Sequence, residues 1–438
     1  MNKKTVTIIG FGRFGKTLYE LLKNDFDVTI YQRTKTTTKF HTTTDLEKAY
    51  ESETIFYAVP INTFEEVISQ HKKYFRNDHV LLDVLSVKVY PEKIFKKYLK
   101  DTQIQAILTH PMFGPDSSKE SFNNLPLVID KFLAKDETYH FWKNFFEDKS
   151  LHVIKLTPDE HDKLAANSQG VTHFIGRLLD EFKMKKTLID TEGAKKLLDV
   201  KEQTCNDTWE LFTNLQQYNP YTKDMRIHFG DAYDKLYDKL IPKQKNEDHL
   251  TIGIQGGKGS FNEEAIHYYI NRNGITDYKI NYLHTTKNVL QSVHEGDSDY
   301  GIFAIQNSIG GIVMESVVAM AKYNFSIIEE FAIKISHALM IRNDATLKDI
   351  TTIMSHPQVF AQCNNTLQQK YPNLIQTSGE GELIDHALVA KELSEGKLPK
   401  NIATMGSKIL AEIYDLKIIE DNLQDLQENY TSFLYVGR

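Results

Sequence analysis

The sequence predicts an α/β protein in which two α/β regions flank an all-helical segment. Short apolar runs alternate with helical patterns over about the first 150 residues, strand formers become rare from Pro158 to about Leu240, and the alternation resumes at Leu250. Such alternation is typical of a parallel sheet that helices cover. A chain of 438 residues is also too long for one hydrophobic core, so two or three domains are expected.

The individual strands and helices are predicted from the spacing of their apolar residues. The first sheet should contain strands at residues 5–9, 28–31, 54–58, 80–83 and 105–109. Helical spacing marks residues 161–182, 191–217 and 222–240, and a further strand and helix are expected at 250–255 and 262–270. We therefore expect domains at residues 1–155, 156–241 and 250–438, with a short polar linker at 242–249.

The composition excludes several classes of protein. A net charge of -7 argues against a nucleic-acid partner, which usually requires a basic surface. Cys205 and Cys363 are too few for a disulfide framework or a metal cluster, so no metal and a reducing, cytoplasmic location are expected. No apolar run approaches the roughly 20 residues of a membrane helix. The short apolar run at the start leads directly into glycines, which favours a strand over a signal peptide.

A glycine-rich loop follows the first predicted strand and precedes a predicted helix. It consists of Gly10, Phe11, Gly12, Arg13, Phe14 and Gly15. In a Rossmann-type, doubly wound domain the first glycine allows a tight turn, the second lets the backbone approach a pyrophosphate, and the third lets helix and strand pack closely. A glycine-rich turn of another α/β fold is the alternative, but the position between strand and helix favours dinucleotide binding.

The end of the second predicted strand indicates which dinucleotide binds. An NAD site has an acidic residue there, which binds the ribose 2′-hydroxyl. This chain has Gln32, Arg33 and Thr34 instead, and no carboxylate. Arg33 and Thr34 could bind a 2′-phosphate through charge and hydrogen bonds, so we expect NADP. The alternative is that Arg33 and Lys35 are solvated loop charges.

Two further predicted strands end in residues that are suited to catalysis. Ser86 and Lys88 follow one of them, and His110 lies at the end of the next, directly before Pro111. In a doubly wound sheet the carboxyl ends of the strands border the ligand cleft. A histidine at this place could act as a base, although a single histidine there is more often structural.

Taken together, these motifs resemble those of the prephenate/arogenate dehydrogenase family, most closely the plant-type arogenate enzymes, over about residues 4–240. The matching residues are 10–15, 83–88, 109–117, 161–163, 165–166, 168–169, 172–173, 176–177, 191, 193, 197–198, 202–204, 207 and 218–220. The resemblance implies that arogenate or prephenate is oxidised and loses carbon dioxide as its ring becomes aromatic. It also implies a homodimer that forms through the helical domain.

The resemblance implies roles for particular residues. His110 would take the proton of the ring hydroxyl, as a neutral imidazole can near pH 7, and Ser86 would hydrogen-bond the same hydroxyl. Gln169, His173 and Thr191 match positions that line the substrate pocket. Gln169 and His173 are four residues apart, so one face of a helix can present both.

One departure from the bacterial prephenate enzymes bears on the substrate. Those enzymes carry an arginine in the helical domain that pairs with a substrate carboxylate, whereas this chain has Asn-Asp-Thr-Trp at residues 206–209. Asp207 matches the acidic position of the arogenate-type enzymes. It would attract the ammonium group of arogenate and repel the keto acid of prephenate, so we expect a preference for arogenate. A solvent-exposed or helix-capping aspartate is the alternative.

The second α/β region begins with another glycine loop and contains several polar motifs. The loop at 255–261 lies between a predicted strand and helix, where an anion could bind. The later motifs lie at residues 301–308, 310–311, 337–339, 355–358, 362–363, 422–425 and 429–433. In this order, they resemble the catalytic domain of prephenate dehydratases over about residues 250–437.

This second resemblance implies a two-lobed α/β fold, like a small periplasmic-binding protein, with the active site between the lobes. Thr431 matches the family's essential threonine, at a site that must protonate the departing ring hydroxyl as carbon dioxide leaves. Asn307, Ser308, Ser355 and Gln362 match other polar positions of that site. Because none of these side chains is a strong acid, the pocket would work mainly by orienting hydrogen bonds.

Three departures separate the chain from the dehydratases. Ser432 stands where the family has arginine, Gln306 stands where it has glutamate, and residues 377–381 follow the small-residue motif only loosely. Loss of the arginine could weaken binding of a substrate carboxylate or remove a structural ion pair. The chain also ends five residues after Phe433, so we expect no regulatory ACT module and no feedback through it.

We therefore expect a bifunctional enzyme. Its first half would oxidise arogenate (or prephenate) with NADP toward tyrosine, and its second half would dehydrate prephenate (or arogenate) toward phenylalanine. In a second hypothesis, which Gln306 and Ser432 keep open, only the dehydrogenase is catalytic and the C-terminal half is a binding, sensory or structural domain. A third, a dehydrogenase of another substrate, is disfavoured by the matched residues of the first half.

Overall fold

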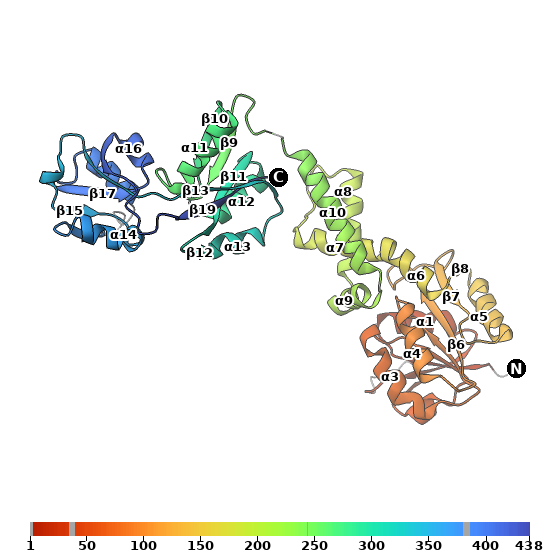
Figure 1. Cartoon of the computed structure of the whole chain (residues 1–438). Coiled ribbons are helices and arrows are strands. Elements are labelled where there is room, and N and C mark those ends of the chain that lie inside the picture. Colours follow the sequence, from red (N-terminus) through yellow and green to blue (C-terminus); the bar gives the residue numbers. More distant parts are fainter. Residues whose placement is uncertain (1–2, 35–39, 243, 380–385) are drawn as a thin grey trace. The chain divides into compact units, whose positions relative to one another are not determined.

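The computed structural model describes residues 3–34, 40–242, 244–379 and 386–438. The chain divides into two compact units, Met1–Tyr233 and Asp234–Arg438 (Figure 1). Within the described ranges, no helix combines the length and the apolar character that a membrane span requires. Each unit has its own sheets and hydrophobic cores.

The first unit contains an eight-stranded sheet in the order β3-β2-β1-β4-β5-β6-β7-β8. The strands are β1 (Thr5–Ile9), β2 (Asp27–Tyr31), β3 (Thr42–Thr43), β4 (Thr54–Tyr57), β5 (Val80–Asp83), β6 (Gln105–Pro111), β7 (Pro126–Asp130) and β8 (His152–Lys155). From β3 to β6 all neighbours are parallel, as the alternation predicts. Beyond the five predicted strands the sheet continues with β7, which runs antiparallel to β6, and with β8, which is parallel to β7.

Helices cover both faces of this sheet. α1 (Arg13–Leu22) and α5 (Asp136–Asp148) pack on one face, where Trp142 is nearly fully buried. The other face carries α2 (Leu46–Ala49), α3 (Phe64–His71) and α4 (Val89–Tyr98), together with the 3-10 turns η1 (Ile61–Thr63) and η2 (Lys72–Tyr74). A fully buried side chain such as Phe64 stabilises this packing by about 1.5–3 kcal/mol.

The expected all-helical segment follows the sheet. It consists of α6 (Pro158–Ala165), the π-helical turn η3 (Ala166–Gly170), α7 (Val171–Glu181), α8 (Glu192–Cys205), α9 (Trp209–Tyr218) and α10 (Thr222–Leu240). α6 begins at a capping box in which Thr157 and Glu160 satisfy each other's backbone N–H groups. The predicted helix at 191–217 is interrupted, because the Thr208 hydroxyl caps a new helix at Trp209.

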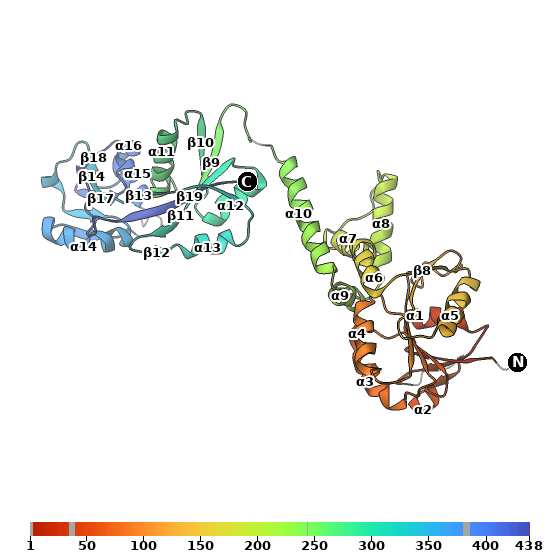
Figure 2. The same cartoon turned by 45° about the vertical axis from the view of Figure 1, so that its right-hand side comes forward.

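The second unit has two lobes, each with its own sheet (Figure 2). The first lobe contains β9 (Leu250–Ile254), β10 (Tyr278–Tyr282), β11 (Tyr300–Asn307), β12 (Gly311–Ile312), β13 (Ser326–Lys334) and β19 (Tyr430–Gly437). α11 (Phe261–Asn273) packs on one face of this sheet, and α12 (Thr286–Glu295) and α13 (Met314–Met320) pack on the other. β19 is the last strand in the chain, yet it lies between β11 and β13.

The second lobe is inserted between β13 and β19. Its sheet has the order β16-β15-β17-β14-β18, formed by β14 (Ala338–Arg342), β15 (Thr352–Met354), β16 (Ile375–Thr377), β17 (Ile402–Gly406) and β18 (Leu416–Glu420). α14 (Pro357–Lys370) covers one face, and α15 (His386–Ser394) and α16 (Ile409–Tyr414) cover the other. A 3-10 turn, η4 (Leu347–Asp349), precedes β15. The two-lobed α/β expectation for this half is therefore confirmed.

The boundary between the two units lies inside α10 and not in the expected linker at 242–249. The last turns of α10 already pack on the second unit, where Tyr237 stacks on His294 with ring centroids 5.1 Å apart. The expected linker is also held there, because the Lys245 backbone N–H donates to Asp299 at 2.5 Å. These contacts assign the end of the helical segment to the second unit.

A buried ion pair joins the ends of β5 and β6. The Lys88 ammonium donates to the Asp83 carboxylate and to the Thr109 carbonyl, and both charged side chains are almost inaccessible to solvent. Thr109 in turn donates its backbone N–H to Asp83 at 3.2 Å. Burial raises the pKa of Asp83 and lowers the pKa of Lys88, and the attraction between the two groups opposes both shifts.

We predict that Lys88→Met destabilises the first unit by about 3–5 kcal/mol, because it leaves the Asp83 carboxylate buried without a counter-charge. Both tryptophans of the chain, Trp142 and Trp209, belong to the first unit, so urea unfolding followed by tryptophan fluorescence measures its stability. The matched control is the double variant Asp83→Leu/Lys88→Met, which should lose less. An unchanged midpoint in the single variant would contradict this account.

Candidate active sites

The glycine loop of the first unit has the shape that a dinucleotide site requires. Gly10 has φ +98°, and a Cβ there would meet the Ala58 carbonyl oxygen at 2.5 Å. A Cβ on Gly15 would meet the Gly10 carbonyl oxygen at 2.4 Å, so α1 packs against the loop only if this residue is glycine. A Cβ on Gly12, by contrast, would meet nothing within 4 Å. Open space next to the second glycine is where a pyrophosphate would approach the start of α1.

Other residues of the fingerprint serve different purposes. Phe11 packs against Phe40, with ring centroids 5.0 Å apart, and Phe14 packs against Phe113 at 6.2 Å. Both aromatic rings therefore belong to the core layer beside the loop. At the end of β2, Arg33 and Thr34 expose their side chains, as a contact with a 2′-phosphate would require. Lys35 lies outside the described residues.

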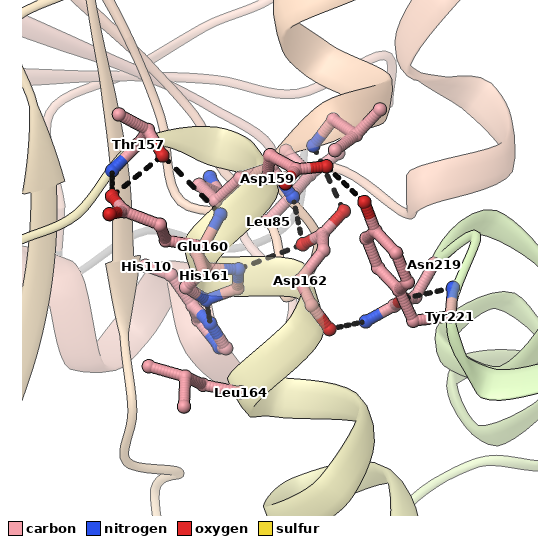
Figure 3. Close-up of polar contacts among 12 residues, drawn as sticks. Leu85, His110, Thr157, Asp159, Glu160, His161, Asp162, Leu164, Asn219 and Tyr221 are labelled. Atoms are coloured by element: carbon pink, nitrogen blue, oxygen red, sulfur yellow. Dashed lines mark hydrogen bonds and ion pairs between the residues drawn. The ribbon is translucent and has the colours of Figure 1, made fainter. Parts of the chain in front are cut away.

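His110 lies at the end of β6 in a buried chain of hydrogen bonds (Figure 3). Its Nδ1 is 2.7 Å from Nε2 of His161, and Nδ1 of His161 is 2.8 Å from Oδ1 of Asp162. A carboxylate only accepts hydrogen bonds, so His161 donates from Nδ1 and must accept at Nε2. His110 therefore carries its proton on Nδ1, which leaves Nε2 as a bare lone pair.

The surroundings keep His110 neutral. Burial lowers its pKa well below the ordinary value of 6.5, and the nearby charges of His161, Lys88 and His173 lower it further. Burial also lowers the pKa of His161, although the hydrogen bond to Asp162 opposes that shift. A neutral imidazole with one bare nitrogen can accept a proton from a bound hydroxyl near pH 7.

Asp162 holds this chain in place through its other contacts. Its two carboxylate oxygens accept the backbone N–H groups of Lys88 at 2.7 Å and Val89 at 3.0 Å. Its own carbonyl accepts a hydrogen bond from the Asn219 side chain at 2.8 Å (Figure 3). Asp162 thus joins the loop after β5, helix α6 and the residue after α9 around His110.

The helical segment contributes a row of polar side chains from η3 and α7. Gln169 and His173 are both half-buried, and Oε1 of Gln169 and Nδ1 of His173 lack a hydrogen-bond partner in the described part of the chain. His173 is close enough for its charge to lower the pKa of His110. The π-helical turn at Gln169 is of a kind that occurs frequently at functional sites. The structure therefore places His173, but not demonstrably Gln169, near His110.

Asp207 lies between the two parts of the first unit. Its Oδ1 accepts a hydrogen bond from Arg13 of the glycine loop at 3.0 Å, and Arg13 also pairs with Asp116 at 2.8 Å. The charge of Asp207 also acts on His173, so both residues belong to one site. Arg13 therefore contacts the side chain expected to select the substrate, in addition to lying in the expected dinucleotide loop.

Two predicted site residues, Ser86 and Thr191, make no hydrogen bond to His110 among the described residues. Ser86 is half-buried in the loop after β5, and among the described residues no hydrogen bond joins it to His110. Thr191 is exposed and caps the start of α8, where its hydroxyl accepts the Ala194 backbone N–H at 3.2 Å. Thr191 therefore caps a helix, and among the described residues no hydrogen bond joins it to His110.

The second unit gathers most of its predicted residues at the junction of its lobes. The Asn307 side-chain amide donates to the Thr431 hydroxyl at 2.9 Å and to Asn429 at 2.8 Å. Asn307 and Thr431 are direct neighbours across β11 and β19. The Gln362 oxygen on α14 accepts from Nε2 of His337 at 2.7 Å and from Asn429 at 3.4 Å. One polar network thus joins the sheet of the first lobe to the second lobe.

Ser308 and Ser355 lie beside this network and have structural partners. The backbone N–H of Tyr430 donates to the Ser308 hydroxyl at 2.9 Å, which fixes the start of β19. The buried Ser355 donates to the Met405 carbonyl at 2.6 Å, which ties the loop before α14 to β17. Neither hydroxyl hydrogen-bonds to Thr431 among the described residues.

Two of the three departures from the dehydratases, Gln306 and Ser432, face each other. Gln306 of β11 and Ser432 of β19 are direct cross-strand partners. Side chains alternate between the faces of a strand, so this pair points away from the face that carries Asn307 and Thr431. Opposite charges at such positions would contribute about 0.2–1 kcal/mol to strand pairing. The glutamate and arginine of the family are thus replaced together by a neutral pair that does not contact the polar network.

Four residues in these networks have no role in the sequence analysis: His161, Asp162, His337 and Asn429. All four lie in motifs that the resemblances contain, so the signal was present. Their partners are distant in sequence, however, as the 51 residues between His110 and His161 illustrate. Nothing local in the sequence shows which of the matched polar residues touch each other.

Comparison with known proteins gives three matches to family models. The nucleotide-binding domain of prephenate dehydrogenase matches residues 18–155, the TYRAAT1-like C-terminal domain matches residues 178–251, and prephenate dehydratase matches residues 252–438. The dehydrogenase and dehydratase matches therefore occur in succession in one chain, as the two resemblances imply.

Individual relatives agree with this division. Chloroplastic arogenate dehydrogenase 2 of Arabidopsis thaliana is 30% identical over 250 residues, which cover 54% of this chain and 70% of that protein. A bifunctional chorismate mutase/prephenate dehydratase of Buchnera aphidicola is 30% identical over 205 residues, 46% of this chain and 51% of that protein. The chain thus spans about half the length of this second relative. Among solved structures, a prephenate dehydrogenase from A. aeolicus in complex with hydroxyphenyl propionate and NAD+ is 15% identical, covers 63% of this chain and 99% of that one, and has a TM-score of 0.46.

We predict that His110 carries its proton on Nδ1 and that Asp162→Leu weakens this preference. Without the carboxylate, Nδ1–H of His161 loses its acceptor, so His161 can donate from Nε2 and His110 can carry its proton on Nε2 instead. Nitrogen NMR of histidine-labelled protein distinguishes protonated from bare ring nitrogens, and a His110→Gln sample assigns the signals. Asp159→Asn, which changes an exposed carboxylate on the same helix, is the control and should leave the tautomer unchanged. A protonated Nε2 of wild-type His110 would refute the inferred tautomer.

Proposed function

We propose, from the premise that the chain belongs to the arogenate dehydrogenase family and continues into a prephenate dehydratase domain, that it catalyses both reactions. The first unit would oxidise and decarboxylate arogenate toward tyrosine, and the second would dehydrate and decarboxylate prephenate or arogenate toward phenylalanine. The observation that carries the proposal is the oriented chain of His110, His161 and Asp162 beside a loop that fits a dinucleotide.

In the first unit, His110 would hold the proton during oxidation. Its bare Nε2 accepts the proton of the ring hydroxyl, while His161 and Asp162 stabilise the imidazolium that forms. Loss of carbon dioxide from the ring then gives the aromatic product, and His110 returns the proton to the phenolic oxygen. The lowered pKa of His110 keeps this base available at pH values well below its ordinary value of 6.5.

The cofactor of the first unit is a nicotinamide dinucleotide, and we propose NADP. When bound, the nicotinamide ring accepts the hydride that leaves the hydroxyl-bearing ring carbon. The glycine loop would hold the pyrophosphate, and the exposed Arg33 and Thr34 would bind the 2′-phosphate. No described residue at the end of β2 offers the carboxylate that an NAD site uses.

Arogenate is the proposed substrate of the first unit. Asp207 presents a carboxylate to the site, and Arg13 holds only its Oδ1 among the described residues, which leaves Oδ2 for an ammonium group. The keto-acid side chain of prephenate carries no ammonium group. Its carboxylate would therefore be repelled by the Asp207 carboxylate, with no positive charge on the side chain to offset the repulsion.

In the second unit, Thr431 would donate a proton toward the departing hydroxyl. Asn307 donates to its oxygen, so the threonine O–H is directed away from Asn307 and toward a ligand. The Gln362 oxygen already accepts two hydrogen bonds, which leaves its NH2 group to bind a substrate carboxylate. Because Gln306 and Ser432 lie on the opposite face of the sheet, their replacement does not argue against dehydratase activity.

A homodimer is also proposed. The helical segment exposes large apolar side chains to solvent in the single chain, and Phe182, Leu188 and Ile189 expose most of their surface. Contiguous apolar surface of this kind is typical of a protein interface. The compartment is proposed to be reducing and cytoplasmic, in keeping with the free thiols of Cys205 and Cys363.

Arg33→Ala tests the choice of cofactor. We expect KM for NADP to rise by about tenfold or more, because a charge-assisted hydrogen bond to the 2′-phosphate is lost, whereas KM for NAD should not change. Lys96→Ala, which removes an exposed cation from the same domain, should change neither value. Equal effects of Arg33→Ala on both dinucleotides would contradict binding of the 2′-phosphate.

The dehydratase is tested by incubating the protein with prephenate, and separately with arogenate, in the absence of NADP. We expect phenylpyruvate or phenylalanine to form, and Thr431→Ala to slow this by about a hundredfold or more. Thr431→Ser, which keeps a hydroxyl, should retain part of the activity, and the charge-restoring Gln306→Glu/Ser432→Arg variant should retain most of it. No product, with NADP-dependent oxidation intact, would mean that the second unit only binds a ligand.

A further inference from the structure

Arg177 continues the row of polar side chains that Gln169 and His173 begin. The three residues follow one another at intervals of four, so they lie on one face of the helix and about 6 Å apart along it. Each has a buried polar atom with no hydrogen-bond partner among the described residues: Oε1 of Gln169, Nδ1 of His173 and Nε of Arg177. Three such atoms in a row indicate a surface that a ligand completes.

The guanidinium of Arg177 is held rigidly. One of its terminal nitrogens donates to the Asp207 carbonyl at 2.6 Å. Its central carbon lies 5.1 Å from the Trp209 ring centroid and 5.6 Å from the Phe212 ring centroid. These contacts fix the plane of the group but leave Nε–H unused. A buried N–H donor without a partner is unfavourable, and a carboxylate satisfies it best because it can accept two parallel N–H groups.

The position of Gln169, His173 and Arg177 relative to His110 indicates which end of the substrate they would contact. The charge of His173 acts on His110, and the charges of Asp207 and Arg177 act on His173. His173 is therefore near the base and also near the side chains of Asp207 and Arg177. A substrate whose ring hydroxyl lies at His110 would extend its opposite end, the amino-acid side chain, toward that pair.

We propose that Arg177 binds the side-chain carboxylate of the substrate while Asp207 binds its ammonium group. This inference rests on the proposed dehydrogenase function and deepens it. The helical arginine of the bacterial enzymes is absent from residues 206–209, but α7 supplies a guanidinium that stacks on Trp209 of the same segment. Together, Arg177 and Asp207 match both charges of an α-amino acid, so the site selects a zwitterion.

The test compares ligands that differ by one charge. L-tyrosine carries both charges, tyramine lacks the carboxylate, and 3-(4-hydroxyphenyl)propionate lacks the ammonium group. Calorimetry in the presence of NADP measures the binding of each to the full chain. We expect wild type to bind tyrosine about ten- to a hundredfold more tightly than tyramine, and Arg177→Gln to bring this ratio close to one while tyramine affinity stays unchanged. Arg177→Lys should give an intermediate ratio.

Two control variants make the outcome specific. Asp207→Asn should instead weaken tyrosine and tyramine and leave 3-(4-hydroxyphenyl)propionate unchanged. Arg226→Gln removes another arginine of the helical segment that also donates to a backbone carbonyl, that of Gln216, and should leave every ratio unchanged.

The possible outcomes separate this inference from the proposed function. An unchanged tyrosine/tyramine ratio in Arg177→Gln overturns the inference, and so does an equal loss of both ligands, which would assign Arg177 a structural role. A wild type that discriminates as expected but does not oxidise arogenate overturns the proposed function alone. A wild type that binds neither ligand overturns both.

Discussion

The buried ion pair of Lys88 and Asp83 is the constraint on which the first active site depends. It joins the ends of β5 and β6, the two strands whose following residues carry Ser86 and His110. Removing two charges from water is costly, and here their attraction, the hydrogen bonds from the Leu85 and Thr109 N–H groups to Asp83, and the bond from Lys88 to the Thr109 carbonyl offset that cost. Asp162 extends the arrangement by accepting two backbone N–H groups from the same loop. Asp162 thereby attaches the helical segment to the sheet next to His110, the base that it helps to orient.

The same low-dielectric environment explains why the base works as a neutral group. A buried histidine with positive neighbours avoids protonation, and His161 and Asp162 then decide which nitrogen carries its one proton. The row from Gln169 to Arg177 has the complementary property. It offers polar atoms that no described residue satisfies. The site is therefore oriented on the side of the base, and it has unsatisfied polar groups on the side of the substrate.

The proposed site of the second unit must also orient its substrate, and none of its predicted residues is a strong acid or base. Asn307, Asn429 and Thr431 are fixed by the pairing of β11 with β19, and Gln362 joins them from the other lobe. Oriented hydrogen bonds of this kind stabilise a leaving hydroxyl and a departing carboxylate because they are in place before the reaction. Gln306 and Ser432 are cross-strand partners on the other face of the sheet, so these two departures from the family do not alter this network.

The sequence by itself determined the five parallel strands β1, β2, β4, β5 and β6, the helical segment, the glycine loop, His110 and the succession of a dehydrogenase-like and a dehydratase-like region, because these depend on local periodicity, turn residues and ordered motifs. The tertiary structure decided which distant residues touch. His161 orients His110, Arg177 reaches Asp207 from another helix, Gln306 faces Ser432, and Thr191 caps α8. It also shows that β7 runs antiparallel to β6 and that the boundary between the units lies within α10. Contacts of this kind depend on strand register and helix packing, which join segments that no local pattern relates.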